Sequence, residues 1–313
     1  MRYVIGVDGG GTFTRAVVMD EERAERGRGA GGPGNYHSAG KGATLANIQS
    51  AVDEALGAAS LTRAQISHAC FALGGVGRPA DRDIAQSFAQ AILPDAHAVV
   101  CNDGVAALYS GAGKAEGIVV VAGTGSIIYG FAPDGRKARA SGWGYRLGDE
   151  GSAWWLAEQS LFAIARARDG RGAPSDMSAR YLKCLNLNQP EDLIGWAYSP
   201  AWTRDSVAAL APLTLDAAQA GDPPALQIVS QGTSALAQAV EVVACKLDMQ
   251  SSAYKVVLYG GLFRSAFYVS AMRRAMNERS PNANTILPTV DAATGAAWIA
   301  LDALHGIEHV WID

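Results

Sequence analysis

Two segments of the chain share one pattern: an apolar strand, a glycine turn that carries hydroxyl residues, and a returning apolar strand. The first contains Asp8-Gly9-Gly10-Gly11-Thr12, and the second contains Ala122-Gly123-Thr124-Gly125-Ser126. This weak internal repeat predicts two related α/β lobes that face one cleft. Because glycine lets backbone N–H groups approach phosphate oxygens closely, and hydroxyls add further donors, the turns predict a pair of phosphate loops.

The rest of the chain alternates between apolar runs and helical patterns. Strands are predicted over 3–7, 15–19, 66–73, 98–101, 117–121, 127–131, 256–259 and 285–287. Helices are predicted near 45–56, 81–92, 105–110 and 292–304, with mostly helical structure over 152–250. Residues 21–34 are charged and then rich in glycine and proline, which predicts a hairpin tip and a loop. Strands that alternate with helices indicate a largely parallel sheet covered on both faces.

Composition excludes several classes of protein. Lys and Arg total 26 against 30 Asp and Glu, and this net charge of −4 argues against a protein that coats nucleic acid. No apolar stretch approaches the roughly 18 residues of a membrane span, so no membrane association is expected. The cysteines (Cys70, Cys101, Cys184 and Cys245) are widely spaced, which argues against a zinc ribbon or a disulfide scaffold. They predict buried free thiols and a cytoplasmic location.

Two carboxylates follow predicted strands. In parallel sheets, ligands bind beyond the carboxyl ends of the strands, where Asp8, Gly74 and Asp103 are expected. Asp8 heads the first turn and is a candidate ligand for Mg²⁺, through water. Asp103 ends a strand and starts a helix, so it is either a helix N-cap or the base that accepts the proton of an attacking alcohol.

The segment Gly142–Ser152, G-W-G-Y-R-L-G-D-E-G-S, combines glycines with two aromatic and two acidic residues before a helix. It is either the solvated first turn of that helix or a carbohydrate-binding lip. Carboxylates accept hydrogen bonds from sugar hydroxyls, and an aromatic ring covers the apolar face of a sugar, which favours the lip. Asn35 is either a turn residue or a further polar contact.

Four motifs in register resemble those of the N-acetylglucosamine kinases within the BadF/BadG/BcrA/BcrD-type ATPase family of the actin-like sugar-kinase superfamily. They are V-D-G-G-G-T near the start, N-D-G-x-A-A from residue 102, A-G-T-G-S from 122 and G-W-G-x-x-x-G-D-E-G-S from 142. The resemblance implies an α/β fold of two actin-like (ribonuclease H-like) lobes with an ATP cleft between them. The expected lobes are 1–115 and 116–313, with the last helix, near 292–304, packing back on the N-terminal lobe.

The resemblance also implies an activity and a set of residues. The expected reaction is ATP-dependent, Mg²⁺-supported phosphorylation of the 6-hydroxyl of N-acetyl-D-glucosamine, with Asp103 as catalytic base and Asp8 on the Mg²⁺ side. The residues expected to bind ATP are Gly9, Gly10, Gly11, Thr12, Thr14, Gly123, Thr124, Gly260 and Gly261. Those expected to bind the sugar are Asn35, Gly75, Asp103, Gly125, Ser126, Gly142, Trp143, Gly144 and Asp149.

Three alternatives stay open at this stage. A glucosamine kinase differs only in what faces the 2-substituent, and an N-acetylmuramic acid kinase needs open space at the 3-position. A regulatory ATPase that acts on a protein partner is the alternative of another class, although the chain lacks the close cysteine pair of the cluster-binding ATPases in this family. The expected partners are ATP and an amino sugar, without nucleic acid or membrane. A homodimer is expected because two-fold dimers are the commonest oligomers.

Overall fold

The computed structural model describes residues 1–307, and the contacts among these residues divide the chain into two compact units. The first unit contains Met1–Val119, Phe131–Lys137 and 288–307, and the second contains Val120–Gly130 and Ala138–Leu287. The boundary at residues 115/116 stays a prediction, and the last six residues of the expected second lobe, 308–313, lie outside the described chain.

The sheet of the first unit runs in the order β3-β2-β1-β4-β5. Its strands are β1 (Tyr3–Gly9), β2 (Thr14–Asp20), β3 (Glu25–Gly31), β4 (Ile66–Leu73) and β5 (His97–Asn102). The first three pair antiparallel, whereas β1, β4 and β5 are parallel to one another. The parallel strands therefore end at the same edge of the sheet, as the sequence predicted.

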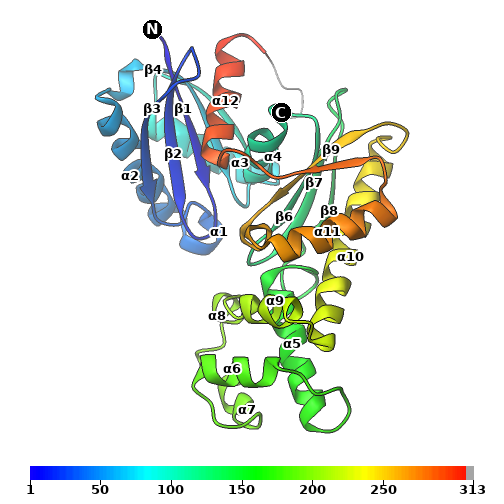
Figure 1. Ribbon diagram of the computed structural model, residues 1–313. Helices are drawn as coiled ribbons and strands as arrows, with labels where there is room; N and C mark the ends of the chain where they lie inside the picture. Colours follow the sequence, from blue (N-terminus) through cyan, green and yellow to red (C-terminus); the bar gives the residue numbers. More distant parts are fainter. Residues whose placement is uncertain (308–313) are drawn as a thin grey trace. The chain divides into compact units, whose positions relative to one another are not determined.

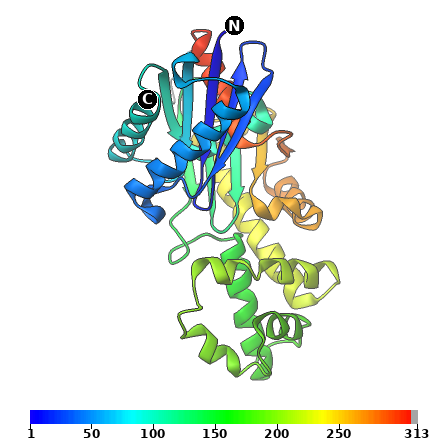
Figure 2. The same cartoon turned by 90° about the vertical axis from the view of Figure 1, so that its left-hand side faces the viewer.

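Helices cover both faces of this sheet. Helix α2 (Lys41–Ala59) packs against β2 and β3, and Figure 2 shows it crossing the face of these strands. Helix α12 (Ala292–Leu304) packs against β1, β4 and α4 (Asp103–Ala112), although it comes from the far end of the described chain (Figure 1). The remaining elements here are α1 (Tyr36–Ala39), η1 (Arg63–Gln65) and α3 (Pro79–Ile92), which packs on β5.

The predicted hairpin tip is confirmed at residues 21–24, which connect the antiparallel strands β2 and β3. The predicted loop is wrong over 25–31, because this stretch is the strand β3. Gly27, Gly29 and Gly31 all point toward α2, and a Cβ atom on any of them would come within 2.1–2.2 Å of a carbonyl oxygen of that helix. Only glycine fits such a close approach of strand to helix backbone. The alternating glycines therefore belong to a packed strand rather than to a flexible segment.

A second sheet has the order β10-β9-β6-β7-β8. Its strands are β6 (Gly117–Ala122), β7 (Ser126–Phe131), β8 (Lys137–Ser141), β9 (Tyr254–Tyr259) and β10 (Ala283–Ile286). The helices of the second unit are α5 (Ala153–Arg168), α6 (Met177–Leu185), α7 (Asp192–Ala197), α8 (Arg204–Ala208), α9 (Ala211–Gln219), α10 (Pro223–Lys246) and α11 (Ala266–Arg279), with the short η2 (Gly261–Arg264). The helical character predicted for 152–250 is confirmed.

Helix α10 corrects one sequence-based expectation. It has the length and mean hydropathy of a membrane span. Small and polar residues are interspersed along the helix, so its sequence contains no unbroken apolar run. Half of its most apolar window is buried inside the protein, and the helix packs against α5, α9 and α11. This burial is typical of the core helix of a globular unit.

The cysteines also depart in part from expectation. Cys70 and Cys101 are buried on neighbouring strands with their sulfur atoms 3.8 Å apart, whereas Cys184 and Cys245 are exposed. The prediction of buried thiols is therefore wrong for the latter two, because they lie on outward faces of α6 and α10.

Candidate active site

The parallel strands of the first unit bring several predicted residues together. Gly9 at the end of β1 lies opposite Leu73 at the end of β4, which in turn lies opposite Asn102 at the end of β5. The backbone N–H of Gly74 donates a 2.7 Å hydrogen bond to the carbonyl oxygen of Gly9. The first glycine turn, the Gly74-Gly75 turn and Asp103 therefore share one edge of the sheet, as predicted.

Asp103 is the first residue of α4, but Asn102 is the N-cap, since its side chain accepts the Gly104 N–H at 2.9 Å. Asp103 Oδ1 lies 3.0 Å from the same N–H, and a Cβ atom on Gly74 would come within 3.2 Å of Asp103 Oδ2. Burial raises the pKa of Asp103 to about 6, although backbone N–H groups oppose the shift. Such a carboxylate is suited to accept a proton near neutral pH.

Asp8 is buried at the end of β1. Burial, and after it the neighbouring carboxylates of Asp103 and Asp291, raise its pKa to about 8 against the opposing charge of Arg15. A divalent cation would neutralise this concentration of acidic groups. Because no three His, Cys, Asp or Glu side chains of residues 1–307 form a metal-binding group, Mg²⁺ would depend on Asp8 together with phosphate oxygens and water.

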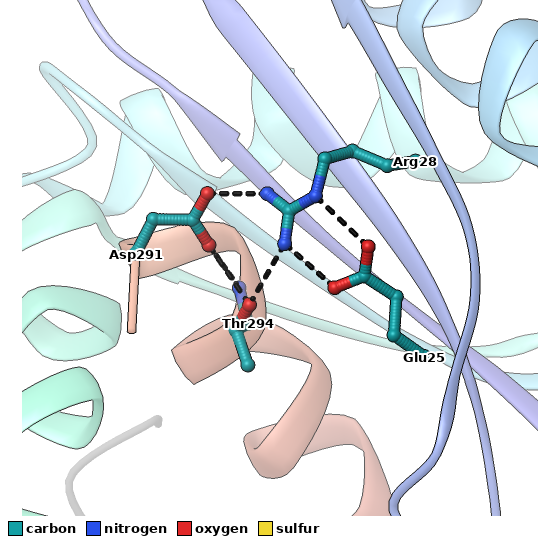
Figure 3. Close-up of polar contacts among 4 residues, drawn as sticks. All are labelled: Glu25, Arg28, Asp291 and Thr294. Atoms are coloured by element: carbon teal, nitrogen blue, oxygen red, sulfur yellow. Dashed lines mark hydrogen bonds and ion pairs between the residues drawn. The ribbon is translucent and has the colours of Figure 1, made fainter. Parts of the chain in front are cut away.

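Asp291 was not predicted as a site residue, and Figure 3 shows how it is held. It is the N-cap of α12 and accepts the Thr294 N–H at 3.0 Å. The guanidinium of Arg28 on β3 binds Asp291 and also the carboxylate of Glu25, the latter at 2.7 and 3.0 Å. Arg28 escaped notice because its strand was predicted as a loop, and Asp291 offered no signal beyond that of a helix cap.

Asn35 lies beside the same turn. It is the N-cap of α1, where its side-chain oxygen accepts the His37 N–H at 3.0 Å. A Cβ atom on Gly75 would come within 2.9 Å of the same oxygen, and one on Gly74 within 3.5 Å of the Asn35 side-chain nitrogen. Asn35, Gly75 and Asp103 are therefore neighbours around Gly74, although they are far apart in the sequence.

Backbone hydrogen bonds hold the first glycine turn at Gly10 and leave its tip exposed. Gly10 donates to the Phe13 carbonyl oxygen at 3.0 Å, and the Gly10 carbonyl oxygen accepts the Gly34 N–H at 2.9 Å. Gly11 and Thr12 are exposed, so their polar groups are open to a ligand. Thr14 differs, because it is buried and its hydroxyl donates to the Gly32 carbonyl oxygen at 2.8 Å.

The second glycine turn, by contrast, is attached to the start of α5. The carbonyl oxygen of Gly123 accepts the Ala153 N–H at 2.9 Å, and that of Thr124 accepts the Trp154 N–H at 3.2 Å. The Ser126 hydroxyl is also engaged, since it donates to the Glu150 carbonyl oxygen at 2.9 Å. These bonds fix the turn before any ligand arrives.

Gly260 and Gly261 follow the end of β9, next to this turn. A Cβ atom on Gly260 would come within 2.4 Å of the Ala122 carbonyl oxygen, and its φ of 113° also requires glycine. Gly261 is exposed. Both residues therefore border the second turn at the neighbouring strand end.

The loop over 141–151 packs over the second turn. Asp149 is buried in the left-handed region (φ 63°), and the N–H of Ser126 binds its carboxylate. The side chain of Ile127 fills the space beside Gly142, and Gly144 also has a positive φ. Trp143 is 67% exposed, which leaves its ring available to a ligand, with the Arg139 guanidinium 5.6 Å from its centre.

Arg204, the first residue of α8, is a member of this group that the sequence did not reveal. Its Nη2 lies 3.2 Å from Asp149 Oδ2, and a Cβ atom on Gly125 would come within 2.2 Å of the same nitrogen. The segment T-R-D-S carries only the signal of a helix start, so only the fold connects it with residues 55 positions earlier.

Comparison with known proteins identifies the family of this chain. The profile of the BadF/BadG/BcrA/BcrD ATPase family matches residues 5–300. The chain belongs to this family.

Relatives in this family match the chain over nearly its full length. The chain is 31% identical to an N-acetyl-D-glucosamine kinase of Dictyostelium discoideum, over 96% of this chain and 98% of the relative. It is also 31% identical to an N-acetylmuramic acid/N-acetylglucosamine kinase of Clostridium acetobutylicum, with the same coverage of both chains. A crystal structure of a candidate N-acetylglucosamine kinase from Chromobacterium violaceum superposes with a TM-score of 0.76 at 29% identity, covering 96% of this chain and 99% of the other. The predicted α/β class with actin-like lobes is confirmed.

Proposed function

We propose that the protein is an ATP-dependent kinase that phosphorylates the 6-hydroxyl of N-acetyl-D-glucosamine. Family membership and the two relatives named for kinases of this sugar support the reaction class. The observation that carries the proposal is Asp103 at the strand end, a carboxylate that has no cationic partner among residues 1–307. Its pKa is raised to about 6, and Asn35 and Gly74 lie nearby.

In the proposed reaction Asp103 accepts the proton of the sugar hydroxyl as its oxygen attacks the γ-phosphorus. The bond between that phosphorus and the bridging oxygen breaks, and ADP leaves with the electron pair. Asn35 would orient the sugar from the same unit. Gly125, Ser126, Gly142, Trp143, Gly144 and Asp149 of the second unit would contribute further sugar contacts.

The two glycine turns, Gly9–Gly11 with Thr12 and Gly123 with Thr124, would hold the triphosphate. The N–H groups of Gly10 and Gly123 already donate to the carbonyl oxygens of Phe13 and Gly125, so these two glycines would shape the turns. The backbone N–H groups of Gly11 and Thr124 and the Thr12 hydroxyl would donate to the phosphates. Gly260 and Gly261 would border the adenine. Asp8 would hold Mg²⁺, and the ion would neutralise charge on the phosphates. Since the Thr14 hydroxyl is already bound to Gly32, we propose that Thr14 supports the first turn from beneath.

The other sequence-based expectations stay predictions: a cytoplasmic homodimer without nucleic-acid or membrane partners. N-acetylmuramic acid is the alternative sugar with most support, because the relative from Clostridium acetobutylicum is named for it as well. Glucosamine and a regulatory role toward a protein partner are the further alternatives.

A coupled ADP-release assay with Mg·ATP tests the proposal. The panel contains N-acetylglucosamine, glucosamine, N-acetylmuramic acid, N-acetylmannosamine, glucose and a blank without sugar. We expect turnover well above the blank with N-acetylglucosamine, and phosphate at the 6-position in the NMR spectrum of the product. Equal ADP release with every sugar and with the blank would overturn the kinase proposal and leave the regulatory ATPase.

A further inference from the structure

The ion pair between Arg204 and Asp149 presents mainly its cation to solvent. The side chain of Arg204 is 43% exposed, whereas that of Asp149 is 3% exposed. A guanidinium carries five N–H donors, and the described chain occupies one of them, at Asp149 Oδ2. The pair therefore leaves a positively charged group with unused donors directly beside Gly125 and Asp149.

Packed aromatic rings hold the chain around Arg204 in place. The rings of Tyr145 and Trp154 lie 4.7 Å apart, those of Trp154 and Trp202 5.9 Å, and those of Trp202 and Trp196 4.9 Å. Thr203, between Trp202 and Arg204, caps α8 through the Ser206 N–H at 3.1 Å. Trp202 and Thr203, the two residues that precede Arg204, are thus both held in place, so the backbone from which the Arg204 side chain extends is anchored.

A sugar hydroxyl bound to Asp149 would come close to this group. Hydrogen bonds of about 3 Å from the hydroxyl to the carboxylate, and from the carboxylate to Arg204, place the sugar within about 6 Å of the guanidinium. An acidic substituent on the ring carbon next to that hydroxyl is long enough to reach from the sugar to the guanidinium. Guanidinium and carboxylate then match in charge and in fork geometry.

We propose that Arg204 is a specificity-determining residue that binds a carboxylate carried by the sugar, so that the enzyme accepts N-acetylmuramic acid as well as N-acetylglucosamine. This inference rests on the proposed kinase function. N-acetylmuramic acid is N-acetylglucosamine with a lactyl ether, whose carboxylate is the only charge on the molecule. The same exposed cation disfavours glucosamine, whose amino group is protonated.

The test compares kcat/KM for the two acetylated sugars in the wild type, in Arg204→Gln and in Arg204→Lys. Arg166→Gln is the matched control, because Arg166 is an exposed arginine near the far end of α5 whose side chain has no bonding partner among residues 1–307. A charge-assisted hydrogen bond corresponds to roughly 10- to 100-fold in binding. We expect Arg204→Gln to lower kcat/KM for N-acetylmuramic acid at least 10-fold more than for N-acetylglucosamine, and Arg166→Gln to change neither.

Arg204→Lys keeps the charge but loses the fork, so an intermediate preference is expected. Circular dichroism and turnover of N-acetylglucosamine show whether Arg204→Gln folds. If it does not fold, Arg204→Lys replaces it as the test variant. An equal loss with both sugars would overturn the inference and reduce Arg204 to a positioning residue for Asp149. Wild-type turnover of N-acetylglucosamine without turnover of N-acetylmuramic acid would also overturn it while the proposed function stands. Turnover of neither sugar would overturn both.

Discussion

Asp103 and Asp149 are acidic residues at turns beside glycine motifs, yet their surroundings differ. The groups that stabilise the charge of Asp103 are backbone N–H groups, with no cation among the described residues, and burial raises its pKa to about 6. Burial also raises the pKa of Asp149, but there the Arg204 guanidinium and the Ser126 N–H oppose it. Pairing with arginine favours the ionised form of a carboxylate, which accepts hydrogen bonds, whereas a buried carboxylate without a cation takes up a proton more readily. This contrast is the basis for proposing Asp103 as the catalytic base and Asp149 as a sugar-binding acceptor.

The substitution Asp103→Asn should have the largest effect on the difference between the two carboxylates. An amide cannot accept the proton of the sugar hydroxyl, so kcat should fall by about 10²- to 10⁴-fold. Nucleotide binding should survive, because no proposed contact to the phosphates involves this side chain. Steady-state turnover and ADP titration by calorimetry measure the two effects. Full activity of the variant would remove Asp103 from the mechanism.

Asp149→Ala should instead weaken sugar binding. Loss of a charged acceptor for a sugar hydroxyl should raise the sugar KM by roughly 10- to 100-fold, with a much smaller change in kcat. Initial rates at varied N-acetylglucosamine and saturating Mg·ATP separate the two constants. An unchanged KM would move the sugar site away from the 141–151 loop and would also remove the basis for the role of Arg204.

The pH profile tests the comparison with the smallest perturbation. Asp103 accepts a proton only when it is ionised, so kcat/KM should fall as the pH falls through about 6, by up to tenfold per unit below that value. Above it the profile should level off. The measurement is kcat/KM from pH 5 to 8 in buffers of constant ionic strength. A profile that stays flat to pH 5 would mean that Asp103 keeps an ordinary carboxyl pKa.

Local sequence patterns revealed much of the fold. The strands β4 and β9 and the helix α12 are apolar runs or stripes that glycines or caps delimit, and they form where the sequence predicts them. Strand β3 could not be recognised, because its inward-facing residues are glycines that pack against the backbone of α2 and not apolar side chains in a core. Strand β8 and helix α11 were likewise not predicted from the pattern of residues.

The candidate site was predictable only where its residues belong to a motif. Asp103 and Asp149 each stand in a short, recognisable segment, whereas only the fold connects Arg204 with Asp149 and Asp291 with Asp8. Arg204 comes from the helical part of the second unit, and Asp291 from the residues before α12. The signals in their own neighbourhoods, helix caps, are common to many helices and carry no information about distant partners.

The close packing of α12 has a consequence for how the protein is made. Gly295 lets this helix approach the backbone of α4 so closely that a Cβ atom would come within 2.2 Å of a carbonyl oxygen there. About 190 residues separate the ends of these helices, which at roughly 5–20 residues per second corresponds to about 10–40 s of translation. Throughout that interval the nascent first unit exposes the apolar surface that α12 will cover. The second unit, whose larger part is continuous over 138–287, is synthesised in full before that partner.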